Sequence, residues 1–364
     1  LKNKYPDIKQ LFGCCLPGQL IYTENGVVPI EDITAGTKVL THTGEYKNVI
    51  GTMCRNFNGT IYGFTAPRCN TVWLTGEHPV LVGELSNDGS FTTNWIKAEE
   101  LKSSKKQNWK RSITNWNSFV CFPRKNNTTI KSIHLIDFLD SDRYEVKEDG
   151  LIYKKKTKKF EHEYCTNIAN TLQLTPQFMR MIGHYISEGC VPTAHYADKS
   201  EANYLVNFTF GTELKLDRIK QTIDDIEFVC GKCPTVSRRD DKHTHEIAIS
   251  NVTWANIIKN MCGKGCDNKV IPSFVYYADD ECVSNFIHGV FSDAKITEKA
   301  IVLKMTSKNV VWGVRLLLAR FGKLSKVAYK NYDSEHKPCY MMTTTPLEWK
   351  PDKQKQQKYL FDDN

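Results

Sequence analysis

The sequence lacks any long apolar run and any signal-peptide pattern. No stretch approaches the roughly 20 consecutive apolar residues of a membrane-spanning helix, and the first residues show no charged segment followed by an apolar one. The sequence also has no low-complexity linker and no tight repeat, although an order of helix and then strands recurs loosely within residues 175–345. We therefore expect no membrane partner.

Cysteine occurs an odd number of times, 13, and these residues are scattered through a long chain. A disulfide scaffold would frame a small domain with paired cysteines, so the pattern favours reduced thiols in an intracellular, reducing compartment. The 364 residues are enough for two domains with separate cores, and 40% hydrophobic with 25% charged residues is typical of a globular protein. The net charge of +8 permits a polyanionic partner without establishing one.

The pattern of residue types along the sequence changes near residue 130. Residues 15 to about 125 read as short strands rich in Val, Ile, Thr and aromatic residues, separated by Gly, Asn and Asp, which indicates an all-β module. The later region is mixed α/β, with helical spacing of apolar residues at 176–188 and 280–293. Two basic stretches, 102–111 and 153–159, fit either solvated faces or phosphate contacts.

Two adjacent cysteines, Cys14 and Cys15, open the all-β region. Taken alone, each is most simply a small buried hydrophobe. The sequence continues with CLPG, then GVVPIEDITAGTKVL, and then TGEHPVLV, in which Thr75 and His78 stand three residues apart. These motifs, in this order and spacing, resemble the splicing domain of inteins, the Hint fold shared with hedgehog autoprocessing domains. NWIKAEELK and FVCFPRK resemble the strands that follow in that family.

The resemblance implies an all-β Hint splicing domain over residues 15–129, preceded by an N-extein segment at 1–14. In that family the nucleophile opens the domain and a glycine follows three residues later, which fits Cys15 with Gly18. The splice junction would then lie between Cys14 and Cys15. The flanking exteins of a host protein would be partners, and splicing would need no cofactor.

The resemblance also assigns the chemistry at this junction. The Cys15 thiolate would attack the carbonyl carbon of Cys14 and convert the peptide bond into a thioester. The amide nitrogen must be protonated as it leaves, and His78 is the candidate donor because imidazole titrates near neutral pH. Thr75 would supply a hydroxyl hydrogen bond to the scissile peptide or to the developing oxyanion. The simpler alternative for His78 is a structural core histidine.

Two segments of the second region share one plan of helix and glycine. In LTPQFMRMIGHYISEGCV, Thr175 is placed to cap a helix, a proline suits its first position, and Glu188 falls at its C-terminal tip. Gly183 would let another backbone approach closely. DECVSNFIHGVFSDA repeats the plan, with Gly289 at the point of close approach. Two packed core helices explain the glycines and the apolar residues, but not an acidic residue at a buried tip.

This plan resembles the LAGLIDADG homing endonucleases that are commonly inserted in inteins, and the resemblance covers residues 130–345. It implies an α/β domain of pseudo-symmetric αββαββ halves, whose paired helices cross within a saddle of strands that lies along double-stranded DNA. One carboxylate from each helix end would bind divalent metal, with Mg²⁺ as the default, so Glu188 would be a catalytic residue and a metal ligand. The lysines expected to contact DNA are Lys154, Lys155, Lys156, Lys158 and Lys159.

The second helix departs from the family pattern at its tip. Five residues after Gly289 stands Ala294, followed by Lys295 where glycine is usual. Asp293 is a candidate second nuclease acid, but it lies one position early, about 100° around a helix. We expect the missing ligand to damage DNA cleavage severely while leaving DNA binding largely intact.

Several alternatives stay open from the sequence alone. CGKC at 230–233 and CGKGC at 262–266 offer four thiolates for a structural zinc, although buried reduced thiols are the simpler interpretation. The tail at 346–364 lacks the terminal His-Asn pair that splicing needs and resembles a linker returning to the Hint domain, so a C-terminal intein segment is an expected partner, as in a split or truncated intein. A DNA-binding protein with a relic Hint scaffold is one rival. A hedgehog-type domain that passes its thioester to a small nucleophile is another.

Overall fold

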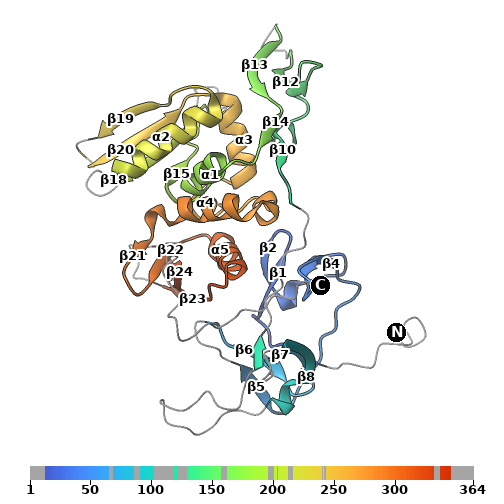
Figure 1. The fold of residues 1–364 in the computed structure, drawn as a ribbon. Helices are drawn as coiled ribbons and strands as arrows, with labels where there is room; N and C mark the ends of the chain where they lie inside the picture. The colour runs from blue at the N-terminus through green and yellow to red at the C-terminus, as the bar shows by residue number, and fades with distance from the viewer. Residues whose placement is uncertain are drawn as a thin grey trace. The chain divides into compact units, whose positions relative to one another are not determined.

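A computed structural model of the chain describes residues 13–64, 69–85, 91–101, 118–120, 129–156, 162–195, 201–202, 204–211, 216–239, 241, 243–331 and 337–345. The chain divides into two compact units, the first built mainly from residues up to 126 and the second from residues 127–318 and 327–346 (Figure 1). Among the residues described, no helix is long and apolar enough to cross a bilayer.

The first unit begins with a sheet of short antiparallel strands, in keeping with its Val-, Ile- and Thr-rich segments. β1 (Leu20–Thr23) and β2 (Gly26–Pro29) form a hairpin in which Thr23 pairs with Gly26. β3 (Lys38–Leu40) and β4 (Tyr46–Asn48) complete a four-stranded sheet with the order β2-β1-β3-β4.

Two further sheets of this unit frame the Thr75–His78 segment. β5 (Ile61–Phe64) pairs with β6 (Val72–Thr75), while β7 (Pro79–Leu85) pairs with β8 (Phe91–Lys97) and with β9 (Ser118–Val120). The segment is therefore the turn between strands of two sheets. Two hydrogen bonds fix this turn: the His78 N–H donates to the Thr75 carbonyl at 3.1 Å, and the Ala98 N–H donates to the His78 carbonyl at 2.8 Å.

The second unit contains two halves with the same order of elements. The first half runs α1 (Pro176–Glu188), β15 (Gly189–Cys190), β18 (Val206–Gly211), α2 (Leu216–Cys230), β19 (Thr235–Arg239) and β20 (Thr244–Ile249), followed by α3 (Val252–Cys262). The second runs α4 (Asp280–Val290), β21 (Lys295–Ile296), β22 (Ile301–Met305), α5 (Lys308–Arg320), β23 (Ser325–Lys330) and β24 (Cys339–Thr344). The α/β prediction for this region is confirmed.

The two sheets of these halves have the same topology. Their strand orders are β15-β18-β20-β19 and β21-β22-β24-β23, so each half places its first, second, fourth and third strands side by side in that order. A short hairpin of β16 (Ala194–His195) and β17 (Glu201–Ala202) is inserted only in the first half, as far as the described residues extend.

The leading helices of the halves, α1 and α4, pack against each other (Figure 1). A Cβ atom on Gly183 would lie 2.3 Å from the Phe286 carbonyl oxygen, and one on Gly289 would lie 2.4 Å from the Arg180 carbonyl oxygen. No side chain fits at either position, because backbone atoms block it. The close approach predicted at both glycines is confirmed.

Local sequence sets the starts of both helices. The Thr175 hydroxyl accepts the Phe178 N–H at 3.2 Å, with a proline at the first position of α1. α4 begins in the same way at Asp279, whose carboxylate accepts the Cys282 N–H at 2.7 Å. The predicted helix over 280–293 is α-helical only to Val290, since a 3₁₀ turn occupies the last three residues.

The remaining strands of the second unit belong to neither half and form a separate ribbon, which contacts α3 through the hydrogen bond from the Asn256 amide to the Tyr144 hydroxyl at 3.4 Å. β10 (Ser132–His134) pairs with β14 (Thr171–Gln173), while β11 (Tyr144–Val146), β12 (Leu151–Lys154) and β13 (Tyr164–Ala169) form a three-stranded sheet. The three-stranded part extends away from α1 and α4 (Figure 1).

Candidate functional site

The Cys14–Cys15 junction lies against β6. Cys15 forms an antiparallel bridge with Leu74, and Cys14 is hydrogen-bonded to Thr75. Adjacent residues of one strand thus hold adjacent residues of the junction, so both sides of the Cys14–Cys15 peptide bond are anchored. The structure brings together three of the residues that the sequence singled out.

Thr75 contacts Cys14 through three hydrogen bonds. Its backbone N–H donates to the Cys14 carbonyl oxygen at 3.0 Å, and its hydroxyl donates to the same oxygen at 3.4 Å. The hydroxyl also accepts the Cys14 N–H at 2.9 Å. Only 2% of the Thr75 surface is exposed, so these bonds lie largely out of water. Two donors therefore face the oxygen that would carry negative charge if the Cys14 carbonyl were attacked.

The chain turns sharply just after Cys15. Gly18 has a φ of 81°, which glycine adopts without the strain that a Cβ would impose, and its N–H lies 2.7 and 2.9 Å from the two carboxylate oxygens of Glu31. Burial raises the pKa of the Cys15 thiol, and the neighbouring Cys14 adds to the shift. The thiol is therefore protonated at neutral pH and needs a base before it can act as a nucleophile.

His78 lies beside Gly13, just before the junction. A Cβ atom on Gly13 would be 2.5 Å from the His78 Cα and 3.0 Å from its Nδ1. This Nδ1 is buried and has no hydrogen-bond partner among the described residues. Burial lowers the pKa of His78, against the opposing effects of the Gly13 backbone and the Glu77 carboxylate. The imidazole is therefore neutral at pH 7, with an unused nitrogen beside the junction.

Arg55, which the sequence motifs did not indicate, also reaches this site. Its guanidinium forms an ion pair with Glu77 and lies 5.2 Å from the centroid of the Phe57 ring. The Cys14 side chain and the Glu77 carboxylate both raise the pKa of the guanidinium. Arg55 belongs to a connection between strands that carries no motif, so only the folded arrangement reveals its position.

Glu188, the predicted metal ligand, ends α1 and is half-buried. Behind this tip, the Lys269 ammonium donates to the carbonyls of Tyr185, Ile186 and Gly189 at 2.7, 2.9 and 2.7 Å. Lys269 is only 6% exposed, and burial lowers its pKa to about 8, with nearby groups including Glu188 opposing the shift. The side chain is therefore charged at neutral pH, and a buried cation caps the helix end that carries Glu188.

The end of α4 carries alanine where α1 carries glutamate. Gly189 opens β15 and Lys295 opens the equivalent strand β21, so the preceding residues, Glu188 and Ala294, are in equivalent positions. Asp293 ends the intervening 3₁₀ turn and is exposed. At these two equivalent positions, the fold therefore places one carboxylate and not two.

Each sheet of the two halves has an open face opposite its buried apolar face. Buried residues such as Phe208, Ile247 and Leu303 alternate with residues that point the other way. On the first sheet the open face holds polar residues: Asn207, Thr209, Ser237, Arg239, Thr244 and Glu246. On the second sheet it holds several lysines beside apolar residues and a threonine: Lys295, Val302, Lys304, Lys330, Met341 and Thr343.

Two polar atoms of the first open face are unsatisfied. The Asn207 Oδ1 and the Thr244 Oγ1 are buried and have no hydrogen-bond partner within the described part of the chain. Such atoms are costly unless a ligand or water satisfies them. These residues were missed because strand pairing, which no local motif encodes, places them on one face.

The lysines that the sequence nominated for DNA contact lie elsewhere. Lys154 ends β12 in the separate ribbon, and Lys155 donates to the Ser141 carbonyl at 2.8 Å. Lys156 follows them, whereas Lys158 and Lys159 lie outside the described residues, as does the basic stretch 102–111. The assignment of these lysines to DNA therefore stays a prediction.

The four cysteines considered for zinc do not form a metal site. Cys262 is buried at the end of α3, whereas Cys233 and Cys266 are exposed. No group of three or more His, Cys, Asp or Glu side chains in the described ranges is arranged to hold a metal ion. The zinc alternative has no support from these side chains.

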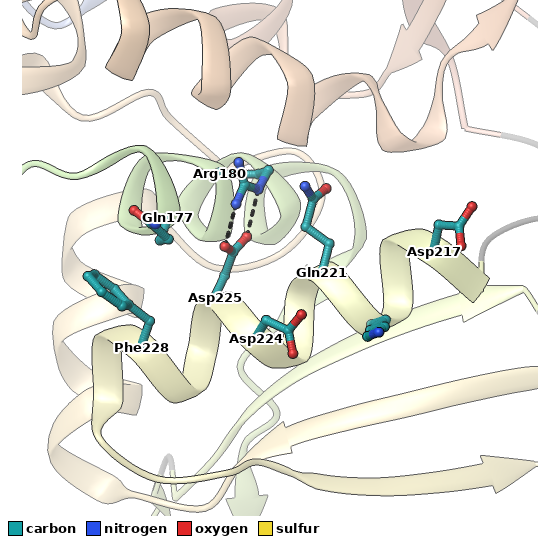
Figure 2. Close-up of a pocket in the computed structure, with 8 residues that line it drawn as sticks. Gln177, Arg180, Asp217, Gln221, Asp224, Asp225 and Phe228 are labelled. Carbon is teal, nitrogen blue, oxygen red and sulfur yellow. Dashed lines mark hydrogen bonds and ion pairs between the residues drawn. The ribbon is translucent and has the colours of Figure 1, made fainter.

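A hollow of about 410 Å³ lies between α1 and α2 (Figure 2). Its floor is the ion pair between Arg180 and Asp225, with N–O distances of 2.8 and 2.6 Å, and Arg180 also donates to Asn285 of α4. Burial raises the pKa of Asp225, while Arg180 opposes the shift. This network ties three helices together, which accounts for its buried charges without a ligand.

Comparisons with known proteins match different parts of the chain. Residues 281–349 match the family described as LAGLIDADG-like domain. An uncharacterized protein of Methanocaldococcus jannaschii is 24% identical over 87% of this chain and 38% of its own length. A probable translation initiation factor IF-2 of the same organism is 25% identical over 90% of this chain and 31% of its own length. The ATP-dependent DNA helicase Hel308 of Thermococcus kodakarensis is 21% identical over 86% of this chain and 28% of its own length.

The chain thus spans less than two fifths of the length of these curated relatives. Among solved structures, I-DmoI in complex with DNA and Ca has a TM-score of 0.36 and 15% identity, covering 47% of this chain and 84% of that one. The homing endonuclease I-WcaI, bound to its DNA recognition sequence, has a TM-score of 0.29 and 14% identity, covering 46% and 76%. The likeness to the LAGLIDADG-like family is thus shown for residues 281–349.

Proposed function

We propose that the first unit is the splicing module of an intein and that it converts the Cys14–Cys15 peptide bond into a thioester. The observation that carries the proposal is the pair of Thr75 donors on the Cys14 carbonyl oxygen, at 3.0 and 3.4 Å, directly beside the candidate nucleophile. A purely structural strand pairing would need the backbone bond alone.

The proposed step conserves atoms and charge. His78 takes the proton of the Cys15 thiol, and the sulfur forms a bond to the Cys14 carbonyl carbon. The negative charge on the carbonyl oxygen is stabilised by the Thr75 N–H and hydroxyl. As the carbon–nitrogen bond breaks, the nitrogen takes a proton from His78 and becomes the free amine of Cys15.

The names and lengths of the relatives support the interpretation of this chain as a module inserted in other proteins. A region similar to 86–90% of this chain occurs in proteins named as a translation initiation factor and as a DNA helicase, where it makes up 31% and 28% of their length. Two proteins with such different names share a segment that neither name describes. That is the distribution expected of an insert that removes itself from unrelated hosts.

Mass spectrometry of the purified chain after incubation with dithiothreitol tests the proposal. We expect a fragment ending at Cys14, which is lost in Cys15→Ala and kept in Cys14→Ala. An intact mass in the unmodified chain, and again after a C-terminal intein segment is supplied in trans, would favour the rival of a relic scaffold.

A second function is supported by the LAGLIDADG-like domain and by the open faces of the second unit. We propose that this unit binds a specific double-stranded DNA site. Lysines on one open face would contact phosphates, while hydroxyl and amide groups on the other, including the unsatisfied Asn207 and Thr244, would read base edges. Selection of bound duplexes from a randomised pool, in EDTA and in Mg²⁺, would test this function; recovery of no enriched sequence would refute it.

The residues present fit a metal site that the protein would share with DNA. They do not fit a site built from protein side chains alone. Glu188 is half-buried at its helix tip, the equivalent Ala294 offers no ligand, and no three acidic or other metal-binding side chains gather in the described ranges. Mg²⁺ is often held by one carboxylate together with nucleic-acid phosphates, and it would stabilise charge on a leaving oxygen. Glu188 would hold the ion, and Lys269 would fix the helix end that presents Glu188.

A further inference from the structure

The segment that contains the junction lies along β6 and the turn after it, antiparallel to them. Its residues face successive residues of that strand, in the pairs Leu16 with Trp73, Cys15 with Leu74 and Cys14 with Thr75. The next residue in this direction, Gly13, lies against His78. Contacts on both sides of the scissile peptide bond therefore set its position, and Gly13 makes the last of them.

His78 occupies the space that a side chain at position 13 would need. A Cβ atom on Gly13 would lie 2.5 Å from the His78 Cα, 3.0 Å from its Nδ1 and 3.1 Å from its Cβ. Carbon atoms in favourable contact are about 3.5–4.0 Å apart, so the added carbon would come at least about 1 Å too close to the Cα. Gly13 is not among the glycines with a positive φ, so the lack of space, and not the backbone conformation, requires glycine here.

The main chain at His78 is held on both sides and cannot easily move away. Its N–H donates to the Thr75 carbonyl at 3.1 Å, and its carbonyl accepts the Ala98 N–H at 2.8 Å. The next residue begins β7, which pairs with β8. A Cβ at position 13 would therefore push the junction away from the turn. That movement would lengthen the bonds from Thr75 to the Cys14 carbonyl oxygen, on which negative charge would develop.

We propose that contact with His78 restricts position 13, two residues before the nucleophile, to glycine. The substrate class is then a host segment that ends in glycine and one further residue before Cys15. This specificity rests on the proposed thioester chemistry at Cys15. Thr75 imposes no such limit on position 14, because its bonds to Cys14 use only main-chain groups. Selection before the junction is therefore by size, at the second residue.

The test compares dithiothreitol-induced cleavage in the unmodified chain, Gly13→Ala and Gly13→Val. We expect Gly13→Ala to be slower by about tenfold or more, because a small misplacement of reacting groups greatly lowers the rate, and Gly13→Val to be slower again. Gly51→Ala is the matched control: Gly51 lies in the same unit, has no positive φ, and a Cβ there would meet no atom within 4 Å. Its rate should equal that of the unmodified chain. Equal rates in Gly13→Ala and the unmodified chain would overturn the proposal.

A second readout does not depend on cleavage. In chains that carry Cys15→Ala, peptide-resolved hydrogen exchange follows the amides of Cys14, Leu16 and Thr75, each of which donates a bond between the two segments. We expect Gly13→Ala to speed this exchange by about fivefold or more. The amides of β1 and β3 should keep their protection, which would show that the unit stays folded.

The two readouts separate the size limit from the chemistry. Unchanged exchange at Cys14, Leu16 and Thr75 in Gly13→Ala would refute the limit at position 13. Faster exchange in Gly13→Ala, together with an unmodified chain that never cleaves, would support the limit and refute the thioester chemistry alone.

Discussion

At the scale of single residues, the Thr75 hydroxyl has two tasks, because it accepts the Cys14 N–H and donates to the Cys14 carbonyl oxygen. Replacing Thr75 by alanine keeps the backbone N–H but removes one donor from the developing oxyanion. We expect thiol-induced cleavage of Thr75→Ala to slow by about 10²-fold or more, which is typical for the loss of one such donor.

Serine is the matched replacement, since it keeps the hydroxyl and loses only a methyl group. Cleavage by Thr75→Ser should stay within about tenfold of the unmodified chain. If the alanine and serine variants were equally slow, the cleavage rate would depend on the packing of the Thr75 methyl group and not on its hydroxyl.

The pH dependence of thioester formation follows from two shifted groups. Burial lowers the pKa of His78 from its ordinary 6.5 and raises that of Cys15 from its ordinary 9.0. Imidazole and thiol together carry one proton between these pKa values, and proton transfer between them gives the reactive thiolate and imidazolium. We expect a level rate across this interval, falling below pH 6.5 as a second proton binds and again above pH 9.0 as the proton donor is lost.

Cleavage rates at saturating dithiothreitol would trace this profile, because thiolysis then no longer limits the rate. In His78→Gln the lower edge should disappear, and the slow residual rate should rise with the thiolate fraction. An unaltered profile in His78→Gln would contradict the role of His78 in proton transfer.

At the scale of elements, the joint between α1 and α4 depends on Gly183 and Gly289. A Cβ in Gly289→Ala would lie 2.4 Å from the Arg180 carbonyl oxygen and 2.9 Å from the Gly183 Cα. Backbone atoms cannot move aside as a flexible side chain can, so we expect a loss of about 1–3 kcal/mol in the stability of the helix pair. Peptide-resolved hydrogen exchange over α1 and α4 would measure the loss.

Gly211→Ala is the control for this change, because no atom lies within 4 Å of the position that its Cβ would take. Its exchange protection should match that of the unmodified chain. Full protection of α1 and α4 from hydrogen exchange in Gly289→Ala would mean that the helices can move apart without a loss of stability.

The sequence predicted these two helices well because their signals are local. Thr175 and the following proline mark the start of α1, and apolar residues at helical spacing mark its buried face. The T-x-x-H motif and Gly18 likewise pointed to the Cys14–Cys15 segment, which the structure places against Leu74 and Thr75. The role of Lys269 could not be predicted from the sequence, because the carbonyls that it binds lie about 80 residues earlier in the chain. Arg55 and the open sheet faces also depend on pairing between distant segments, which spacing along a sequence does not encode.

At the scale of the whole molecule, the absence of a carboxylate at position 294 would separate the proposed DNA binding from DNA cleavage. We expect the chain to bind its selected duplex while cutting it poorly in Mg²⁺. The substitution Ala294→Asp restores an acid at the position equivalent to Glu188, and we expect it to increase cutting of the selected site at least tenfold.

Glu188→Gln in the Ala294→Asp chain should abolish the gain while leaving duplex affinity within about threefold. A gain that survived Glu188→Gln would show that the new aspartate acts without Glu188. Gel analysis of a supercoiled plasmid that carries the selected site separates nicking from cutting of both strands.

The lysines of the second open face provide a further test of DNA binding. Replacing Lys304 by glutamine removes one candidate phosphate contact, so we expect weaker binding to all duplex sequences and a salt dependence reduced by roughly one unit of slope. The same substitution at Lys147, which pairs with Glu163 in the separate ribbon, is the control. Equal effects at both positions would mean that DNA binding depends on the overall charge of the protein and not on the open face.

The shared strand order of the two halves, joined where the backbones of α1 and α4 meet, has a consequence for how the protein can change. The joint is made at its centre of glycine and main chain, and its side-chain bonds, such as that of Arg180 to Asn285, join the helices and not the open faces. One open face can therefore acquire new side chains without forcing compensation in the other. The two faces already differ, one rich in hydroxyl and amide groups and one in lysines, so a duplex that fits both should not be a palindrome. In such an architecture, each half can change the DNA sequence that it recognises separately from the other. Halves from two related chains should therefore assemble into a working hybrid.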